Sequence, residues 1–263
     1  MINITHHYDI RIIMSKKNSW QLIASLFTLS ACLSSQAENI TMGFGESLYP
    51  YVIKEENKGM ELDVIRAALA YKKHTLIPTY APLHSLAILF DKQRVDAINV
   101  TLKADLKRPH FYAKQPSIFY QDIMLTLEKS ELTIKEPNDL KGLRVFAFHS
   151  AHLYHPIWLA PLKDSPKYRE SSLQSSQVSL LHLQRVDVIV ADENIIGYYT
   201  DKLKKEGKIQ LLPTTSHAFA KPIPIKAVFA HQHIRDDFNE GLAHLKETGE
   251  YQKIIDGYKK GME

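Results

Sequence analysis

Polar residues follow two apolar segments that repeat nearly the same phrase. Residues 93–100 read QRVDAINV, and residues 184–191 read QRVDVIVA. Thr101 and Lys103 follow the first copy, and Asp192 follows the second. In open α/β sheets, ligands bind outside the carboxyl ends of the strands. The repeat therefore predicts two strand ends, one in each lobe, that face each other across a cleft and bind a small polar molecule.

Two further segments carry groups suited to binding. Ser150, Ala151 and His152 come directly after a predicted strand, where the free amides at the start of a helix would hold an anionic group. Tyr49 and Tyr51 flank Pro50, which fixes an extended backbone. Their rings would stack on a ligand or pack in the core.

Metal and cofactor chemistry is not predicted. His149, His152 and His155 are spaced by three, but a metal site needs converging nitrogens and usually a carboxylate. The single cysteine, Cys32, lies in the N-terminal apolar segment, so the folded part has no disulfide and no cysteine-based zinc site. Surface or pocket histidines are the simpler interpretation.

The elements that position these groups alternate along the chain. Each copy of the repeat follows residues with helical spacing, and strands are predicted from about residues 40, 75 and 144. Such alternation favours a mostly parallel sheet. We also expect a short helix over residues 105–108 with Asp105 as its N-cap, a strand over 209–212, and helices at the C-terminal end.

The elements divide into two α/β lobes. Residues 38–126 form the first part of lobe 1, residues 127–221 form lobe 2, and residues 222–263 return to lobe 1. Extended segments near residues 125–128 and 219–226 would join the lobes as a two-strand hinge.

The N-terminal residues have the features of an export signal. Lys16 and Lys17 precede an apolar stretch over residues 20–33, and Ser35-Gln36-Ala37 places signal-peptide cleavage after Ala37. Met14 is then a possible true start, and residues 1–37 form the signal peptide. Leu29-Ser30-Ala31-Cys32 offers the alternative of a lipid anchor at Cys32. Both interpretations predict the periplasm.

Composition narrows the class of partner. The chain has 263 residues, 44% hydrophobic and 24% charged, with a net charge of +4. These values are ordinary for a globular protein, and no dense Lys/Arg tract indicates nucleic-acid binding.

The chain resembles bacterial extracellular solute-binding proteins of family 3, the amino-acid receptors of ABC importers. Tyr49-Pro50-Tyr51 with GMELD at 59–63 resembles the family's YPPF…GFDVDL opening. Residues 95–108 resemble its VDA…S…T…R stretch, and residues 139–145 resemble its DLKGK-V segment. Residues 185–192 resemble its G-VDAVV-D segment, and residues 245–254 its closing LK-DGTY--I.

This resemblance implies a type II periplasmic-binding-protein-like fold and roles for particular residues. Arg108 matches the family's carboxylate-binding arginine, with a solvated helix-end arginine as the alternative. Asp192 matches its ammonium-binding carboxylate, with a helix N-cap as an alternative or additional role. Thr101 and the amides near Lys103 would add donors, and Glu46 would face a cationic ligand or solvent. Ser-Ala-His at 150–152 departs from the family's Gly-Thr-Thr.

The resemblance implies a monomeric, non-enzymatic protein that presents an amino acid or analogue to an ABC permease. A periplasmic enzyme resembling cyclohexadienyl dehydratases, with Glu46 and His152 as acid or base, is one alternative. A soluble sensor partner of a membrane signalling protein is another.

Overall fold

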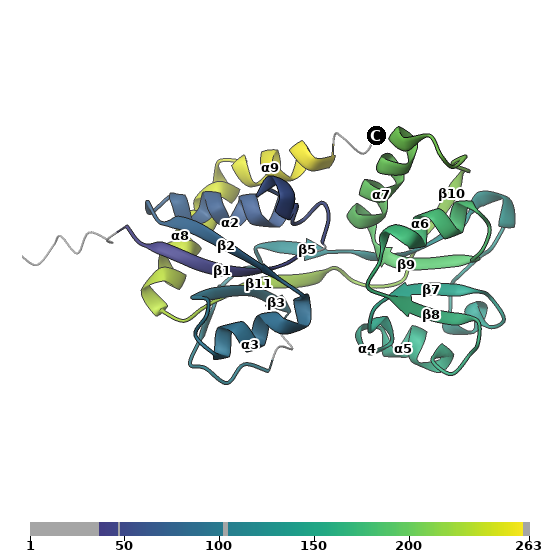
Figure 1. Cartoon of the computed structure of the whole chain (residues 1–263), viewed down its shortest axis with the longest axis horizontal. Coiled ribbons are helices and arrows are strands. Elements are labelled where there is room, and N and C mark those ends of the chain that lie inside the picture. The colour runs from purple at the N-terminus through teal and green to yellow at the C-terminus, as the bar shows by residue number, and fades with distance from the viewer. Residues whose placement is uncertain (1–36, 47, 102–104, 260–263) are drawn as a thin grey trace, which may run out of the picture. The chain divides into compact units, whose positions relative to one another are not determined.

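The computed structural model describes residues 37–46, 48–101 and 105–259, without the side chains of Val100 and Thr101. The predicted signal peptide, apart from Ala37, and Lys103 lie outside the described residues. Two sheets organise the described chain, and each sheet with its helices is called a lobe (Figure 1). No described helix is both long and apolar enough to cross a membrane.

The first lobe is built on a mixed sheet in the order β2-β1-β3-β11-β4, with β5 also paired to β11. β1 is parallel to both β2 and β3, whereas β11 is antiparallel to β3, β4 and β5. The strands are β1 (Asn39–Gly45), β2 (Thr75–Ala81), β3 (Ala97–Thr101), β4 (Phe111–Tyr112), β5 (Ile118–Tyr120) and β11 (Ile223–Phe229).

The second lobe has the order β10-β6-β9-β7-β8. β7 is parallel to β8 and β9, and β6 is antiparallel to both β9 and β10. The strands are β6 (Asp122–Leu127), β7 (Val145–Phe148), β8 (Tyr168–Ser171), β9 (Val188–Asp192) and β10 (Thr214–Ala218). β7, β8 and β9 thus repeat the arrangement of β1, β2 and β3.

Helices cover both faces of the first sheet (Figure 1). α2 (Met60–Ala70) packs on α8 (Gln232–Glu247) and α9 (Glu250–Lys259), and their apolar faces join one buried core. α3 (Leu86–Asp91), which follows η3 (Leu83–Ser85), lies at a second, smaller core on β3 and β11. Gly241 of α8 lies so close to Ala68 that an added Cβ would be 1.9 Å from the carbonyl oxygen of Ala68. This contact fixes the spacing of α2 and α8.

In the second lobe, α6 (Ser175–His182) and α7 (Glu193–Glu206) cover one face of the sheet, and α4 (Ala151–Tyr154) and α5 (Pro156–Leu159) cover the other. The remaining 3-10 turns are η2 (Lys54–Glu56), η4 (Glu128–Ser130), η5 (Pro137–Leu140) and η6 (Ala160–Leu162). Each lobe therefore has its own apolar layer on both faces of its sheet.

The repeated QRVD phrase forms the same turn twice. Gln93 and Gln184 adopt left-handed backbone angles, with φ of 56° and 57°. In each copy the amide of the next residue turns back to the preceding helix: Arg94 to Leu89 O at 2.9 Å and Arg185 to Leu180 O at 2.9 Å. The phrase therefore ends a helix and begins a buried strand.

The aspartate of each copy holds the neighbouring parallel strand. Asp96 Oδ2 accepts the backbone amide of Thr41 in β1 at 2.9 Å. Asp187 Oδ2 accepts the amide of Arg144, just before β7, at 2.7 Å. Both aspartates thus lie at the amino ends of their strands, at the opposite edge from Thr101 and Asp192.

The chain passes between the sheets twice, between β5 and β6 and between β10 and β11. β6 belongs to the second sheet along its whole length, so the first passage lies near Gln121, before the predicted residues 125–128. One passage leaves the first lobe and the other returns to it, so they run in opposite directions. This explains why β5–β11 and β6–β10 are antiparallel pairs, and why both sheets are mixed rather than mostly parallel.

Two local predictions are wrong. Residues 105–108 form no helix, because Pro109 disfavours the helical region for the residue before it and Asp91 Oδ1 accepts the amides of Lys107 and Arg108, each at 3.0 Å. Residues 209–212 form no strand, and β10 begins at Thr214.

Candidate functional site

Asp192 lies where β9 ends and α7 begins. Its Oδ1 accepts the amides of Asn194 at 2.9 Å and Ile195 at 3.1 Å, which is an N-cap. Its Oδ2 accepts the amide of Gln121 at 2.7 Å, from the first passage between the lobes. The residue is only 3% exposed. The predicted N-cap is therefore confirmed, and the carboxylate also holds the passage.

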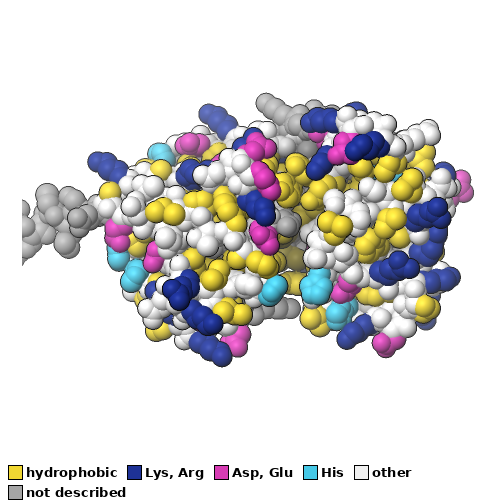
Figure 2. Space-filling view, viewed as in Figure 1, with side chains coloured by type: hydrophobic (Ala, Val, Ile, Leu, Met, Phe, Trp, Pro, Cys, Tyr) yellow, Lys and Arg dark blue, Asp and Glu magenta, His cyan; other side chains and the backbone are white. Residues whose placement is uncertain are grey.

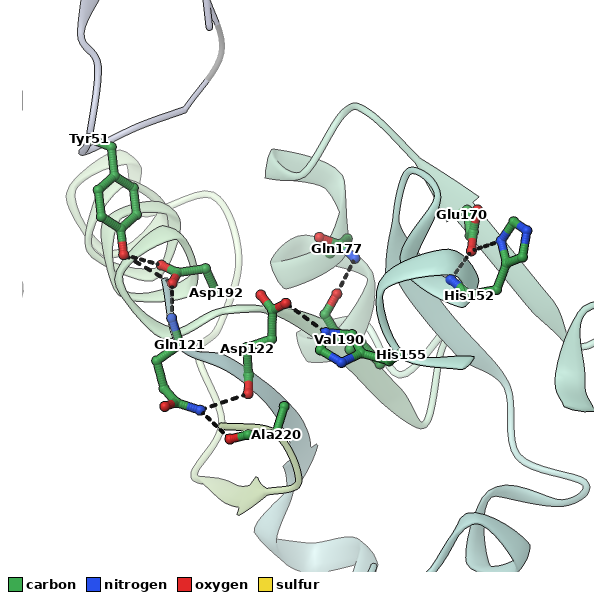
Figure 3. Close-up of polar contacts among 10 residues, drawn as sticks. All are labelled: Tyr51, Gln121, Asp122, His152, His155, Glu170, Gln177, Val190, Asp192 and Ala220. Carbon is green, nitrogen blue, oxygen red and sulfur yellow. Dashed lines mark hydrogen bonds and ion pairs between the residues drawn. The ribbon is translucent and has the colours of Figure 1, made fainter. Parts of the chain in front are cut away.

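Tyr51 reaches Asp192 from the first lobe. Its ring is buried in the core of that lobe, in the loop between β1 and α2. The hydroxyl donates to the Asp192 carboxylate, 3.0 Å from Oδ1 and 2.9 Å from Oδ2 (Figure 3). Asn194 Nδ2 donates to the same hydroxyl at 2.9 Å. One carboxylate at the end of β9 thus caps α7, holds the first passage between the lobes and accepts a hydrogen bond from the opposite lobe.

Burial raises the pKa of Asp192 to about 7, against hydrogen bonds from Gln121, Ile195 and Tyr51 that lower it. The nearby Asp122 adds to the rise. Burial disfavours the charged form of a carboxyl group, and a cation beside it favours that form. A cationic group bound next to Asp192 would therefore be stabilised and would hold the carboxylate ionised.

Glu61 and Tyr120 extend this cluster into the first lobe. Tyr120 hydroxyl donates to Glu61 Oε2 at 2.9 Å, and its ring centroid lies 4.3 Å from that of Tyr51. Glu61 is buried, and burial raises its pKa. Neither residue was predicted from the sequence to belong to the site, although a carboxylate among the apolar residues that open α2 was a usable signal.

Asp122 and His155 form a buried pair in the second lobe. His155 Nε2 lies 2.7 Å from Asp122 Oδ2, and the His155 ring packs 4.7 Å from that of Phe219. Asp122 opens β6 opposite Asp192 in the antiparallel register, so this pair lies beside the same junction (Figure 3). Because the pairing joins distant segments, spacing in the sequence gave no sign of it.

The amides predicted to hold a ligand at residues 150–152 are already occupied. Ser150 and His152 donate their backbone amides to Glu170, at 2.9 Å to Oε2 and 2.9 Å to Oε1. Glu170 comes from β8, at the same edge of the sheet as the end of β7. The prediction of free amides is therefore wrong, because a carboxylate of the chain itself fills their place.

Arg108 is not brought to Asp192. Its Nη1 donates to the carbonyls of Phe90 at 3.3 Å and Val95 at 3.1 Å, and its guanidinium lies 5.0 Å from the Phe90 ring centroid. Val95 precedes β3, so this guanidinium lies at the amino end of the strand and Thr101 at the carboxyl end. The role of Arg108 as a carboxylate ligand stays a prediction.

The other predicted residues lie near the strand ends of the first lobe. Glu46 follows β1, and its Oε2 lies 3.4 Å from Lys54 Nζ. The ring of Tyr49 stacks on that of Tyr198 in α7, with centroids 5.3 Å apart, and so joins the lobes as Tyr51 does. Thr101 ends β3, but its side chain is not described.

Two of the three histidines that are spaced by three in the sequence, His152 and His155, pair with acids. His152 Nδ1 lies 2.7 Å from Glu170 Oε1, and His155 pairs with Asp122. Within the described part of the chain, no three His, Cys, Asp or Glu side chains lie close enough to hold a metal. Lys/Arg and Asp/Glu side chains are interspersed on the face that Figure 2 shows.

The order and pairing of the strands define the class: the chain has the two-lobe α/β fold of periplasmic binding proteins. Neither a protein-family model nor a curated protein sequence matches it.

Solved structures of this fold cover most of the chain. The GluR0 ligand-binding core in complex with L-glutamate has a TM-score of 0.66 and 16% identity, over 86% of this chain and 99% of that one. The substrate-binding protein AbpA from Streptococcus pneumoniae, bound to L-arginine, has a TM-score of 0.62 and 14% identity, over 85% and 95%. A histidine kinase sensor domain has a TM-score of 0.63 and 18% identity, over 84% and 95%. At these identities, the likeness concerns the fold.

Proposed function

We propose that the protein is a solute-binding protein that captures a small polar solute, an amino acid or a close analogue, and delivers it to an ABC permease. The observation that carries this proposal is the buried Asp192 carboxylate at the junction of the lobes. It ends a strand of the second lobe and accepts a hydrogen bond from Tyr51 of the first. The same edge of each sheet is where this class of α/β fold binds ligands.

The solute's ammonium group would bind at Asp192. An ammonium donor beside a buried carboxylate makes a charge-assisted hydrogen bond, which contributes about 1.5–3 kcal/mol. In the structure the Tyr51 hydroxyl donates to this carboxylate, and the ammonium group would replace that hydrogen bond when the solute binds. A solute that contacts both lobes favours the closed arrangement, because only contacts that differ between the open and closed states can shift their balance.

The rest of the solute would lie toward the carboxyl ends of β1 and β3. Thr101 and the amides near Lys103 are proposed donors there, and Tyr49 and Glu46 border the same edge. This proposal does not depend on Arg108, whose Nη1 donates to two carbonyls at the other end of β3.

The comparisons support this class of solute. The two ligand-bound neighbours named above hold L-glutamate and L-arginine. We propose the periplasm as the location and a monomer as the functional form, in keeping with signal-peptide cleavage after Ala37 or a lipid anchor at Cys32.

A native mass spectrum of the purified protein tests the proposal first. We expect a second species that is heavier by the mass of one small solute. Calorimetry of protein stripped by unfolding and refolding should then show saturable one-to-one binding for at least one member of a panel of amino acids and amines. No bound mass, together with no heat from any member of the panel, would contradict the proposal.

A further inference from the structure

Hydrogen-bond donors from three residues surround the Glu170 carboxylate, and this set of donors is here called the pocket. Its Oε1 accepts the backbone amide of His152 at 2.9 Å and the hydroxyl of Tyr168 at 2.6 Å, and it lies 2.7 Å from His152 Nδ1. Its Oε2 accepts the amide of Ser150 at 2.9 Å. Four donors from three residues thus converge on one carboxylate. Figure 3 shows the His152 side chain turned toward it.

The pocket holds this carboxylate in its ionised form. Burial alone would raise the pKa of Glu170, but hydrogen bonds from Tyr168, His152 and Ser150 outweigh it and lower the pKa. Burial and the hydrogen bond to Glu170 raise the pKa of Tyr168, so its hydroxyl remains a donor. The side chains of Glu170 and His152 are only 15% and 18% exposed, so solvent screens this charge less than it screens a surface charge.

The pocket lies at the edge of the second lobe where the proposed solute binds. Glu170 pairs in register with Ala147 of β7, and Ala147 pairs with Val190 of β9. The residues that follow, Ser150 after β7 and Asp192 at the end of β9, therefore extend from the same carboxyl edge. Asp122 opens β6 at that edge too. Glu170, Asp192 and Asp122 thus belong to the same edge of the second sheet.

We infer that these donors of the second lobe form an anion receptor and that the chain's own Glu170 carboxylate occupies it. Glu170 therefore excludes a carboxylate of the solute from this position. The inference rests on the proposed function for the identity of the site, and it narrows the solute class. A second carboxylate brought beside Glu170 would be repelled and would find the four donors taken. The solute presents an amine or a neutral group to the second lobe, so its carboxylate makes no contribution there.

The first arm of the test asks whether the pocket is an anion receptor and needs no knowledge of the solute. In Glu170→Ala the donors are left without an acceptor, and sodium acetate should restore the lost stability with a saturable rise in Tm. Asp139→Ala is the matched control, because Asp139 Oδ2 also accepts two backbone amides, at 2.8 and 3.0 Å, but on the exposed surface. Wild type and Asp139→Ala should show no saturable rise. The same response to acetate in all three proteins would overturn the inference.

The second arm asks what the occupant does to specificity. Calorimetry compares solutes that differ only in the α-carboxylate: lysine with cadaverine, and arginine with agmatine. In wild type the α-carboxylate should gain nothing from the second lobe, so any preference for the amino acids comes from the first lobe alone. Glu170→Ala should shift the preference toward the amino acids by about tenfold or more, the factor for one charged hydrogen bond. Glu170→Gln, which keeps the length of the side chain, should shift it in the same direction and serves if the alanine variant does not fold.

The outcomes separate this inference from the proposed function. If wild type binds no member of the wider panel of amino acids and amines while Glu170→Ala takes up acetate, the receptor stands and the proposed amine or amino-acid solute fails. If wild type binds both amino acids at least tenfold more tightly than their amines, and Glu170→Ala leaves that ratio unchanged, Glu170 does not set specificity and the inference fails.

Discussion

At the scale of single residues, the junction depends on how one side chain is shared. Asp192 caps α7, holds the amide of Gln121 and accepts the hydroxyl of Tyr51. Its position after a β-branched run indicated a strand end and an N-cap. The partners from other segments were not readable in the sequence, because Tyr51 lies 141 residues away along the chain.

The raised pKa of Asp192 predicts a dependence of stability on pH. The carboxyl has a pKa of about 7 in the folded protein against 3.8 as an ordinary carboxyl. Between these values the folded state binds more protons than the unfolded state, so this contribution to the unfolding free energy is lost as pH rises toward about 7. Urea unfolding from about pH 4 to 8 should show that the unfolding free energy of wild type falls, relative to that of Asp192→Asn, as pH rises. Parallel profiles would contradict the raised pKa.

From its contacts we predict that Arg108 stabilises the fold, whereas the resemblance implies that it binds the solute's carboxylate. Arg108→Ala loses two hydrogen bonds to carbonyls and a contact with the face of Phe90. The free energy of unfolding should fall by about 1–3 kcal/mol, while affinity per folded molecule stays unchanged. Arg94→Ala, an exposed neighbour, should change stability by less than about 0.5 kcal/mol. Full stability with lost binding would instead establish Arg108 as a ligand residue.

At the scale of elements, the repeated phrase was the most informative part of the sequence. It predicted helix, turn and buried strand in both lobes, because a run of apolar β-branched residues after helical spacing has few other solutions. The antiparallel strands were harder to predict, since their pairing depends on the chain crossing between lobes. The missing helix at residues 105–108 shows that one proline outweighed an N-cap pattern.

The turn in the phrase yields a test of local strain. Gln93 has φ of 56° and is exposed, whereas the adjacent Lys92 has φ of −84°. Left-handed angles cost about 1–2 kcal/mol for residues with a Cβ, and glycine pays about 0.5–1 kcal/mol in chain entropy. Gln93→Gly should thus leave stability unchanged or raise it by up to about 1.5 kcal/mol, while Lys92→Gly should lower it. Chemical unfolding measures both, and equal losses would show that the turn is unstrained.

At the scale of the whole described molecule, the two lobes are joined by more than their two chain passages. Tyr51 and Tyr49 reach from one loop of the first lobe to Asp192 and Tyr198 of the second. The sequence left these rings either stacked on a ligand or packed in the core. The structure buries the Tyr51 ring in the core of the first lobe and brings both side chains into contact with the opposite lobe. The same side chains therefore join the lobes and border the proposed solute site. A solute that replaces the hydrogen bond between Tyr51 and Asp192 would change how the lobes are held together.

The central claim is that the Asp192 carboxylate binds the solute's amine at this junction. Its most direct test is the affinity of Asp192→Asn for a solute that wild type binds, measured by calorimetry near pH 8. Asparagine keeps the N-cap through Oδ1, but its Nδ2 cannot accept the amide of Gln121. The variant should therefore fold with lower stability, while affinity per folded molecule falls by about tenfold or more. Asp187→Asn, at the opposite end of the same strand, should lose stability but keep its affinity. Equal affinity in wild type and Asp192→Asn would contradict the account.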